Sequence, residues 1–295
     1  MPLEAFGPLS ARGGGLRRRA VNVLAIGACV LAAAVILLPL ALIVWHLAAK
    51  GLPAFRPSFF LHMPKPVGEA GGGMANAIVG TLILVGLGAL IAVPVGVGTG
   101  VYLAEYGGGR MSAIVRYTAD LLAGVPSIVV GVAAYGLVVV PMGRFSAIAG
   151  GVALGILMLP TIVRTTEEVV RLVPQSYRHA ALALGAPRWR VLQSVVVPAA
   201  WSGIATAIML ALARAAGETA PLLLISSIYG NSTTINLFGH AVPNIPVYIF
   251  TLSEQADPTG FARAWGASLV LLAFILLSSL GARALLARSR AKLTR

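Results

Sequence analysis

Long apolar runs dominate this chain of 295 residues and restrict the folds that are open to it. Several runs reach about 20 residues or more, the length that a helix needs to cross the hydrocarbon core of a bilayer. Only 11% of the residues are charged, against about 25% in an average soluble domain, and the mean hydropathy is +0.90. A soluble fold could not bury so much apolar surface. The sequence therefore predicts an all-α polytopic membrane protein.

The runs predict six transmembrane helices. They cover residues 21–48, 76–103, 114–141, 147–163, 195–225 and 264–286, and Pro126 interrupts the third. The basic cluster Arg17–Arg19 precedes the first run, which is longer than the 7–15 residues of a signal-peptide core. We therefore expect the first run to be retained as a membrane anchor.

The distribution of basic residues predicts the orientation. Sixteen of the 22 lysines and arginines fall on the side that carries both termini, five fall on the other side and one lies within a span. Since cytoplasmic loops are enriched in lysine and arginine, both termini are expected in the cytoplasm. The predicted parts are a cytoplasmic tail at 1–20, a first anchor and external loop at 21–75, a transmembrane core at 76–286 and a basic cytoplasmic tail at 287–295.

Several kinds of chemistry are not expected. The net charge of +13 comes mostly from arginines at the ends of the apolar runs, which indicates contact with membrane lipid and no nucleic acid. The four histidines have no metal-binding spacing, and no phosphate loop for ATP is present in the sequence. We therefore predict no catalytic residues, no metal and no cofactor in this chain.

Two charged residues inside the fifth run are the strongest candidates for a substrate path. Arg214 and Glu218 are four residues apart and would lie on one face of a helix. A charge at a helix centre costs roughly 2.5–3.5 kcal/mol to insert, so it normally faces a partner or a water-filled path. The planar fork of arginine matches phosphate oxygens, and Thr219 adds a hydroxyl. The alternative is an ion pair that only positions two helices.

Other charged residues have weaker cases. Arg164 closes the fourth run and is a candidate for an anion contact at the exit or a gate latch. The alternative is an ordinary cytoplasmic arginine followed by two solvated acids, Glu167 and Glu168. Asp120, in the third run, is expected to form a structural pair with Arg116.

The amphipathic segment 177–198 lies between two spans and predicts a contact with another protein. Ala180 and Ala181 are small and favour a helix, so a partner surface can come close. Gly185 can adopt the positive φ that ends one helix, and Pro187 suits the first turn of the next. The alternative is an amphipathic loop at the lipid headgroups.

The spacing in this segment resembles the EAA signature of ABC importer permeases, by which a membrane subunit is gripped by a separate ATPase. In that signature Glu-Ala-Ala is followed after three residues by Gly and after nine more by Ile-x-Leu-Pro. Here the matching residues are Ala180, Ala181, Gly185, Val195, Val197 and Pro198, and His179 stands where the family has Glu. Three further stretches resemble the permease subunits of the phosphate-specific ABC importer, its A-type subunit most closely. They are Gly124–Gly131, Leu159–Glu168 and Ala213–Pro221.

The resemblance implies an importer-permease (MetI-like) fold in the cell inner membrane and a role in phosphate transport. It also implies a second homologous permease subunit, a cytoplasmic ATPase dimer and an external phosphate-binding protein as partners. The residues at the ATPase would be His179, Ala180, Ala181, Gly185 and Pro198. Two alternatives stay open: an ABC permease for another small anion or solute, and a self-contained channel or ion-coupled carrier. The second alternative predicts no dependence on an ATPase, and internal inverted repeats that the sequence does not display.

Overall fold

The structure is a computed structural model that describes residues 15–66, 69, 71–225, 238, 240–255 and 257–293. The chain divides into two compact units, residues 1–49 and residues 50–295. Within the described residues the secondary structure is helical, which confirms the predicted all-α fold class.

The first unit consists of most of helix α1, Gly15–Gly51. Its apolar side chains are exposed around the whole circumference, as expected for a helix that lies in lipid. The helix begins at Gly15, so residues 15–20, which we had assigned to the cytoplasmic tail, are helical. The rest of that predicted tail lies outside the described residues.

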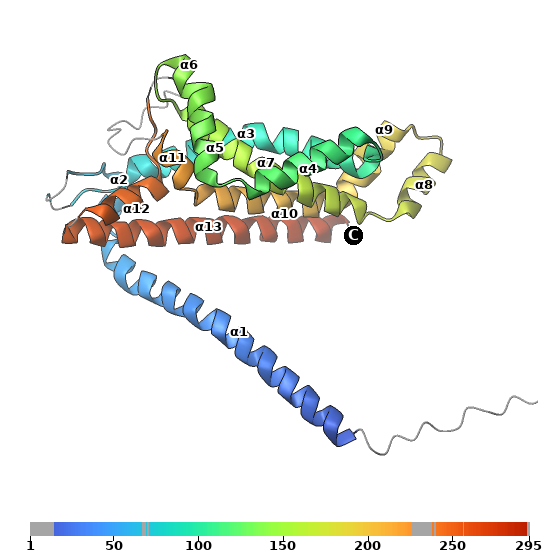
Figure 1. The fold of residues 1–295 in the computed structure, drawn as a ribbon, viewed down its shortest axis with the longest axis horizontal. Helices are drawn as coiled ribbons and strands as arrows, with labels where there is room; N and C mark the ends of the chain where they lie inside the picture. The colour runs from blue at the N-terminus through green and yellow to red at the C-terminus, as the bar shows by residue number, and fades with distance from the viewer. Residues whose placement is uncertain are drawn as a thin grey trace, which may run out of the picture. The chain divides into compact units, whose positions relative to one another are not determined.

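Four long helices form the frame of the second unit: α3 (Ala75–Tyr106), α7 (Ala147–Arg171), α10 (Val197–Ala216) and α13 (Pro258–Leu293). They run alongside one another in Figure 1. Together with α1, these segments make five stretches of the described chain that are long and apolar enough to cross a membrane. The helix α13 continues to Leu293, so residues 287–293 of the predicted basic tail are helical too.

The third predicted span is sharply bent. Helix α4 (Arg110–Gly124) is followed by α5 (Ser127–Ala134), a π-helical segment (Tyr135–Val139) and α6 (Val140–Met142), and the chain turns by 105° between α4 and α5. Pro126 lacks an N–H group, and its ring disfavours the helical conformation at the residue before it. The predicted interruption of the third span at Pro126 is therefore confirmed. Among the described residues, a sixth crossing exists only if the bent pair forms one broken span.

Glycines bring α3 and α7 into close contact, since small residues let transmembrane helices approach closely. A Cβ atom at Gly100 would lie 2.6 Å from Cβ of Thr166, and one at Gly151 would lie 2.6 Å from Cβ of Leu87. Larger side chains at these positions would force the two helices apart. Around this contact, buried side chains from α3, α7 and α10 form the largest core cluster.

A helix that the sequence did not predict lies in the second half of the expected loop 226–262. Helix α12, Ile245–Glu254, begins where the side chain of Asn244 accepts a hydrogen bond from the Val247 N–H at 2.9 Å. Asn244 is a favoured helix cap, and Pro246 suits a first turn. The Tyr248 hydroxyl donates to the Gly73 carbonyl at 3.1 Å, so α12 is fixed to the segment before α3. Residues 226–237 of the expected loop lie outside the described residues.

The short helices η1 (Leu52–Ala54) and α2 (Pro57–Leu61) precede α3. Phe59 of α2 is buried with Met74, Tyr248 and Ala267 in a second core cluster. This cluster lies at the end of the unit where α12 and α13 begin, opposite the end where α3 and α7 finish (Figure 1).

Candidate functional site

The EAA-like segment forms two short helices joined by a tight turn. Helix α8 covers Gln175–Ala183 and α9 covers Arg188–Val191. Gly185 has φ of +80°, which confirms the predicted turn conformation. The Gly185 N–H donates to the Leu182 carbonyl at 2.9 Å, and the Ala186 N–H donates to the Ala181 carbonyl at 3.2 Å. These two bonds are the Schellman arrangement that ends a helix at a glycine.

Two large apolar side chains of this segment are exposed. Leu184 is 89% exposed and Trp189 is 55% exposed, while His179 and Ala180 beside them are exposed too. The guanidinium of Arg190 lies 5.3 Å from the centre of the Trp189 ring. Ala181 is half-buried and packs toward the core. An exposed apolar patch on a basic element suits a contact with another protein.

Pro198 follows a π-helical segment, Leu192–Val196, in which the Val197 N–H bonds to the Leu192 carbonyl. A proline inside an α-helix removes a hydrogen bond and clashes with the carbonyl four residues earlier, and the wider π turn relieves that clash. The same arrangement precedes Pro141, where the Val140 N–H bonds to the Tyr135 carbonyl. Both prolines end a Val-Val-Val-Pro sequence, a signal that the sequence analysis missed.

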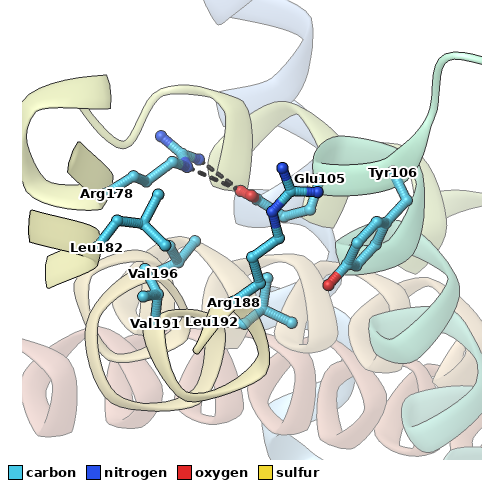
Figure 2. A pocket seen from close by; sticks show the side chains of 8 residues that line it. All are labelled: Glu105, Tyr106, Arg178, Leu182, Arg188, Val191, Leu192 and Val196. Carbon is cyan, nitrogen blue, oxygen red and sulfur yellow. Dashed lines mark hydrogen bonds and ion pairs between the residues drawn. The ribbon is translucent and has the colours of Figure 1, made fainter. Parts of the chain in front are cut away.

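A pocket of about 250 Å³ lies beside these helices and contains an arginine that the sequence analysis counted only as a cytoplasmic charge. Figure 2 shows Arg178 of α8 directed at Glu105, in the last turn of α3, with Arg188 and Tyr106 on the other wall. The Arg178 Nη2 and Nε atoms lie 2.6 Å and 3.0 Å from Glu105 Oε1. The sequence held no local signal for this pair, because its members are 73 residues apart.

The candidate substrate path lies at a break in a helix. Helix α10 ends at Ala216, and α11 (Ala220–Leu223) begins after Thr219. Arg214 is in the last turn of α10, whereas Glu218 lies in the break, so our placement of both on one continuous helix up to residue 225 is wrong. Gly217 ends the helix, and Pro221 cannot continue it because its nitrogen carries no hydrogen.

The break still brings the two charges together. The Arg214 Nε atom lies 3.5 Å from Glu218 Oε1. The Arg214 side chain is 57% exposed in this single chain, while that of Glu218 is 16% exposed. A Cβ atom at Gly217 would lie 4.0 Å from Cδ1 of Ile275, which is well inside the apolar part of α13. The pair is therefore at the depth of the spans and not at their ends.

Two of the stretches that carry the family resemblance meet at this break. A Cβ atom at Gly131 of α5 would lie 2.6 Å from Cα of Pro221 in α11. Only a glycine permits this approach, so the stretch 124–131 packs directly against the end of the stretch 213–221. Helix α5 and the segment that follows the break in α10 are thus in direct contact.

Arg164 lies in a different group of charges. Its Nε atom is 3.0 Å from Asp120 Oδ1, and its Nη1 atom is 3.2 Å from Glu167 Oε2. Asp120 therefore pairs with Arg164, and the predicted pair of Asp120 with Arg116 is wrong.

Glu167 is the centre of that group and is not the solvated acid that we expected. It is 2% exposed, and Oε1 lies 2.7 Å from Arg116 Nε and 2.7 Å from Arg171 Nη2. Helix α7 continues to Arg171 instead of ending near residue 163, which carries Glu167 into the contact with α4. Arg116 pairs across 51 positions of the sequence, a distance over which the local pattern gave no indication.

Helix α10 connects the two regions. Pro198 is in its first turn and Arg214 in its last, so about 24 Å of helix separates the EAA-like segment from the Arg214–Glu218 pair. Between these two regions α10 is one continuous α-helix.

The comparison with known proteins agrees with these features. Residues 96–291 match the family model of the binding-protein-dependent transport system inner membrane component. The phosphate transport system permease protein PstA 1 of Mycobacterium tuberculosis (strain CDC 1551 / Oshkosh) is 40% identical over 271 residues, which cover 90% of this chain and 89% of that protein. PstA of Xylella fastidiosa (strain Temecula1) is 41% identical over 276 residues, covering 93% and 95%.

A solved structure supports the fold. The chain is similar to a subunit of the MetNI methionine ABC transporter in an inward-facing conformation, with a TM-score of 0.56 and 17% identity over 73% of this chain and 94% of that one. This similarity confirms the importer-permease fold. The chain is thus an integral membrane protein that belongs to the binding-protein-dependent transport system inner membrane components and, among them, to the PstA permeases.

Proposed function

We propose that this chain is the membrane subunit of an ATP-driven importer that moves inorganic phosphate across the cell inner membrane, with both termini in the cytoplasm. Relatives at about 40% identity are named phosphate transport system permeases, and the match covers nine-tenths of the chain. The excess of basic residues on one side supports the orientation.

The Arg214–Glu218 pair at the helix break is the observation that carries the proposal. Transporters commonly place substrate sites where a membrane helix is discontinuous, because the break frees polar groups at membrane depth. Arg214 presents a planar set of donors that fits a tetrahedral oxyanion, and its side chain is more than half exposed. At 3.5 Å from Glu218 it is held by a single carboxylate when the path is empty, and phosphate can replace that partner. Thr219, which follows directly, adds a hydroxyl donor.

The partners follow from the exposed surfaces. The apolar face of α8 and α9, with Leu184 and Trp189, is the contact for a cytoplasmic ATPase dimer that hydrolyses ATP. A second homologous permease subunit completes the path beside the exposed Arg214, and an external binding protein delivers phosphate. His179, Ala180, Ala181, Gly185 and Pro198 form or position the ATPase contact, and Arg164 lines the exit of the path.

The test removes the arginine and then its partner. Arg214→Gln keeps a hydrogen-bonding side chain, and we expect it to abolish uptake of radiolabelled phosphate in cells that lack other phosphate carriers. Because this change also strands Glu218, the double variant Arg214→Gln with Glu218→Gln is the control. Uptake is normalised to the amount of assembled complex.

The double variant separates the two roles of the pair. A phosphate site predicts that uptake stays lost, since the guanidinium is absent. If the ion pair is purely structural, uptake should return in the double variant, because neither charge is left without its partner. Near-normal uptake by the double variant would rule out a substrate role for Arg214.

A further inference from the structure

Arg178 fixes the coupling helix α8 to the ends of two membrane helices. It lies in the first half of α8 and is 7% exposed. Besides its two contacts with Glu105 of α3, its Nη2 atom donates to the Val170 carbonyl at 3.0 Å, and its Nη1 atom donates to the Val173 carbonyl. One guanidinium thus joins α8 to the last turn of α3, as Figure 2 shows, and also to the end of α7.

A second arginine holds the end of α3 from the side of α4. The Arg116 Nη2 atom donates to the carbonyls of Leu103 and Gly107 at 2.9 Å and 3.1 Å, while its Nε atom donates to Glu167 of α7 at 2.7 Å. The ends of α3 and α7, the middle of α4 and the helix α8 are therefore linked by two arginines, each bound to a carboxylate and to two carbonyls. We call this set of helix segments the arginine-linked block.

These contacts are too strong to break and re-form readily. A charge-assisted hydrogen bond is short and strong, and the removal of one partner from a buried pair leaves an uncompensated charge. Both Glu105 and Glu167 are largely shielded, with side chains 16% and 3% exposed. The helix segments in the block are expected to keep their relative positions while the complex works.

Helix α9, which follows α8 in the EAA-like segment, is less constrained than α8. Between α3 and α9 the pocket of about 250 Å³ remains, and apolar side chains of Val191, Leu192 and Val196 line its wall. The turn at Gly185 and the π-helical segment 192–196 separate α8 from α10. Tightly packed interiors resist deformation, whereas this pocket leaves α9 room to shift against α8.

We propose that Arg178 is a positioning residue for the coupling between the ATPase and the membrane helices. Together with Glu105 it makes α8 move as one body with α3, within the arginine-linked block. A push on α8 then reaches α3 directly through side chains, and α7 and α4 move with it. The inference rests on the proposed contact of α8 with an ATPase, but it does not depend on the identity of the transported solute.

The first test compares two acids at the same end of the unit. Glu105→Gln removes the charge that Arg178 binds, and Glu168→Gln is the matched control, because Glu168 is exposed and has no side-chain partner within the described residues. In proteoliposomes that contain the full complex, we expect Glu105→Gln to lower the phosphate carried per ATP hydrolysed by about two- to thirtyfold. Basal hydrolysis and the amount of assembled complex should remain near those of the unchanged chain.

Conservative replacement of the arginine adds a check on geometry. Arg178→Lys keeps the charge but loses the fork, and we expect an intermediate ratio of transport to hydrolysis. An unchanged ratio in Glu105→Gln would overturn the proposal. So would a loss confined to the amount of assembled complex, since that result assigns the pair to folding alone.

The second test measures the distance between two helices of the arginine-linked block. With Cys29 replaced by Ser, spin labels at Ser176 of α8 and Tyr102 of α3 report the distance between the two helices. We expect the same narrow distance distribution with and without ATP, and a broad one in Glu105→Gln. A distance that changes with ATP in the chain with native Glu105 would overturn the proposal. Failure of that chain to carry phosphate would instead count against the proposed function and leave this distance unaffected.

Discussion

One backbone angle shapes the surface that α8 and α9 present. The φ of +80° at Gly185 reverses the chain within three residues, and the two hydrogen bonds of the turn satisfy carbonyls at the end of α8. The space around the Gly185 Cα is open, because a Cβ atom there would have no neighbour within 4 Å. The requirement for glycine is therefore conformational and not steric.

Gly185→Val tests this requirement. A β-branched residue is strained at positive φ, by about 1–3 kcal/mol, so the turn should open and the contact with the ATPase should be misplaced. We expect the protein to insert into the membrane while ATP-driven uptake falls sharply. Gly185→Asn is the matched control, since asparagine accepts this conformation, and it should retain most of the uptake. Normal uptake by the valine variant in assayed membranes would contradict the role of the turn.

At the scale of the helices, the sequence predicted features that depend on local chemistry. Pro126 breaks the third span as expected, because the effect of a proline acts on its own neighbours. The break at Gly217 was missed because apolar residues continue on both sides of it, although Gly217 and Pro221 were visible signals. Helix α12 was missed because the prolines around it suggested a loop, whereas Pro246 starts a helix.

In the candidate site, too, the sequence predicted only contacts between residues close together in the chain. Arg214 and Glu218 could be paired from the sequence because they are four positions apart, and the pair survives the helix break. The pairs Arg178–Glu105 and Arg116–Glu167 could not be found, because each joins segments that only the tertiary fold brings together. Local patterns thus predict single elements, while the ion pairs between elements need the fold.

The packing of α3 against α7 can be tested with two glycines of one sequence run. A Cβ atom at Gly100 would lie 2.6 Å from Thr166 Cβ and 2.7 Å from the Val163 carbonyl oxygen, whereas one at Gly98 would meet nothing within 4 Å. We expect Gly100→Ala to lower the melting temperature of the solubilised protein, because α3 must move away from α7. Gly98→Ala is the control and should be neutral or slightly stabilising, by up to about 1 kcal/mol. Equal effects of the two variants would contradict this helix contact.

At the scale of the whole second unit, its two ends differ in character. One end carries α8, α9 and the arginine-linked block, while the other carries α2, α12 and the start of α13 (Figure 1). The basic residues gather at the first of these ends, where Arg178, Arg188 and Arg190 lie on the coupling helices. If that end faces the cytoplasm, the bent pair α4–α5 must cross the membrane once.

Reporter fusions test this arrangement. A reporter at Gly71 should be external, and reporters at Arg110 and Gln175 should be cytoplasmic, because the sides alternate with each crossing. The decisive position is Arg144, which follows α6 and should be external if α4–α5 is one broken span. A cytoplasmic signal at Arg144 together with one at Arg110 would show that the bent pair returns to the side from which it entered.

The pairing of Arg116 with Glu167 also bears on how the chain is made. The two residues are 51 positions apart, so at about 5–20 residues per second the ribosome supplies the acid roughly 3–10 s after the base. During that interval α4 carries an arginine without its carboxylate. The contact that fixes α4 against α7 can therefore form only after α7 has emerged. Biogenesis of this protein is a process in which a later helix completes the placement of an earlier one.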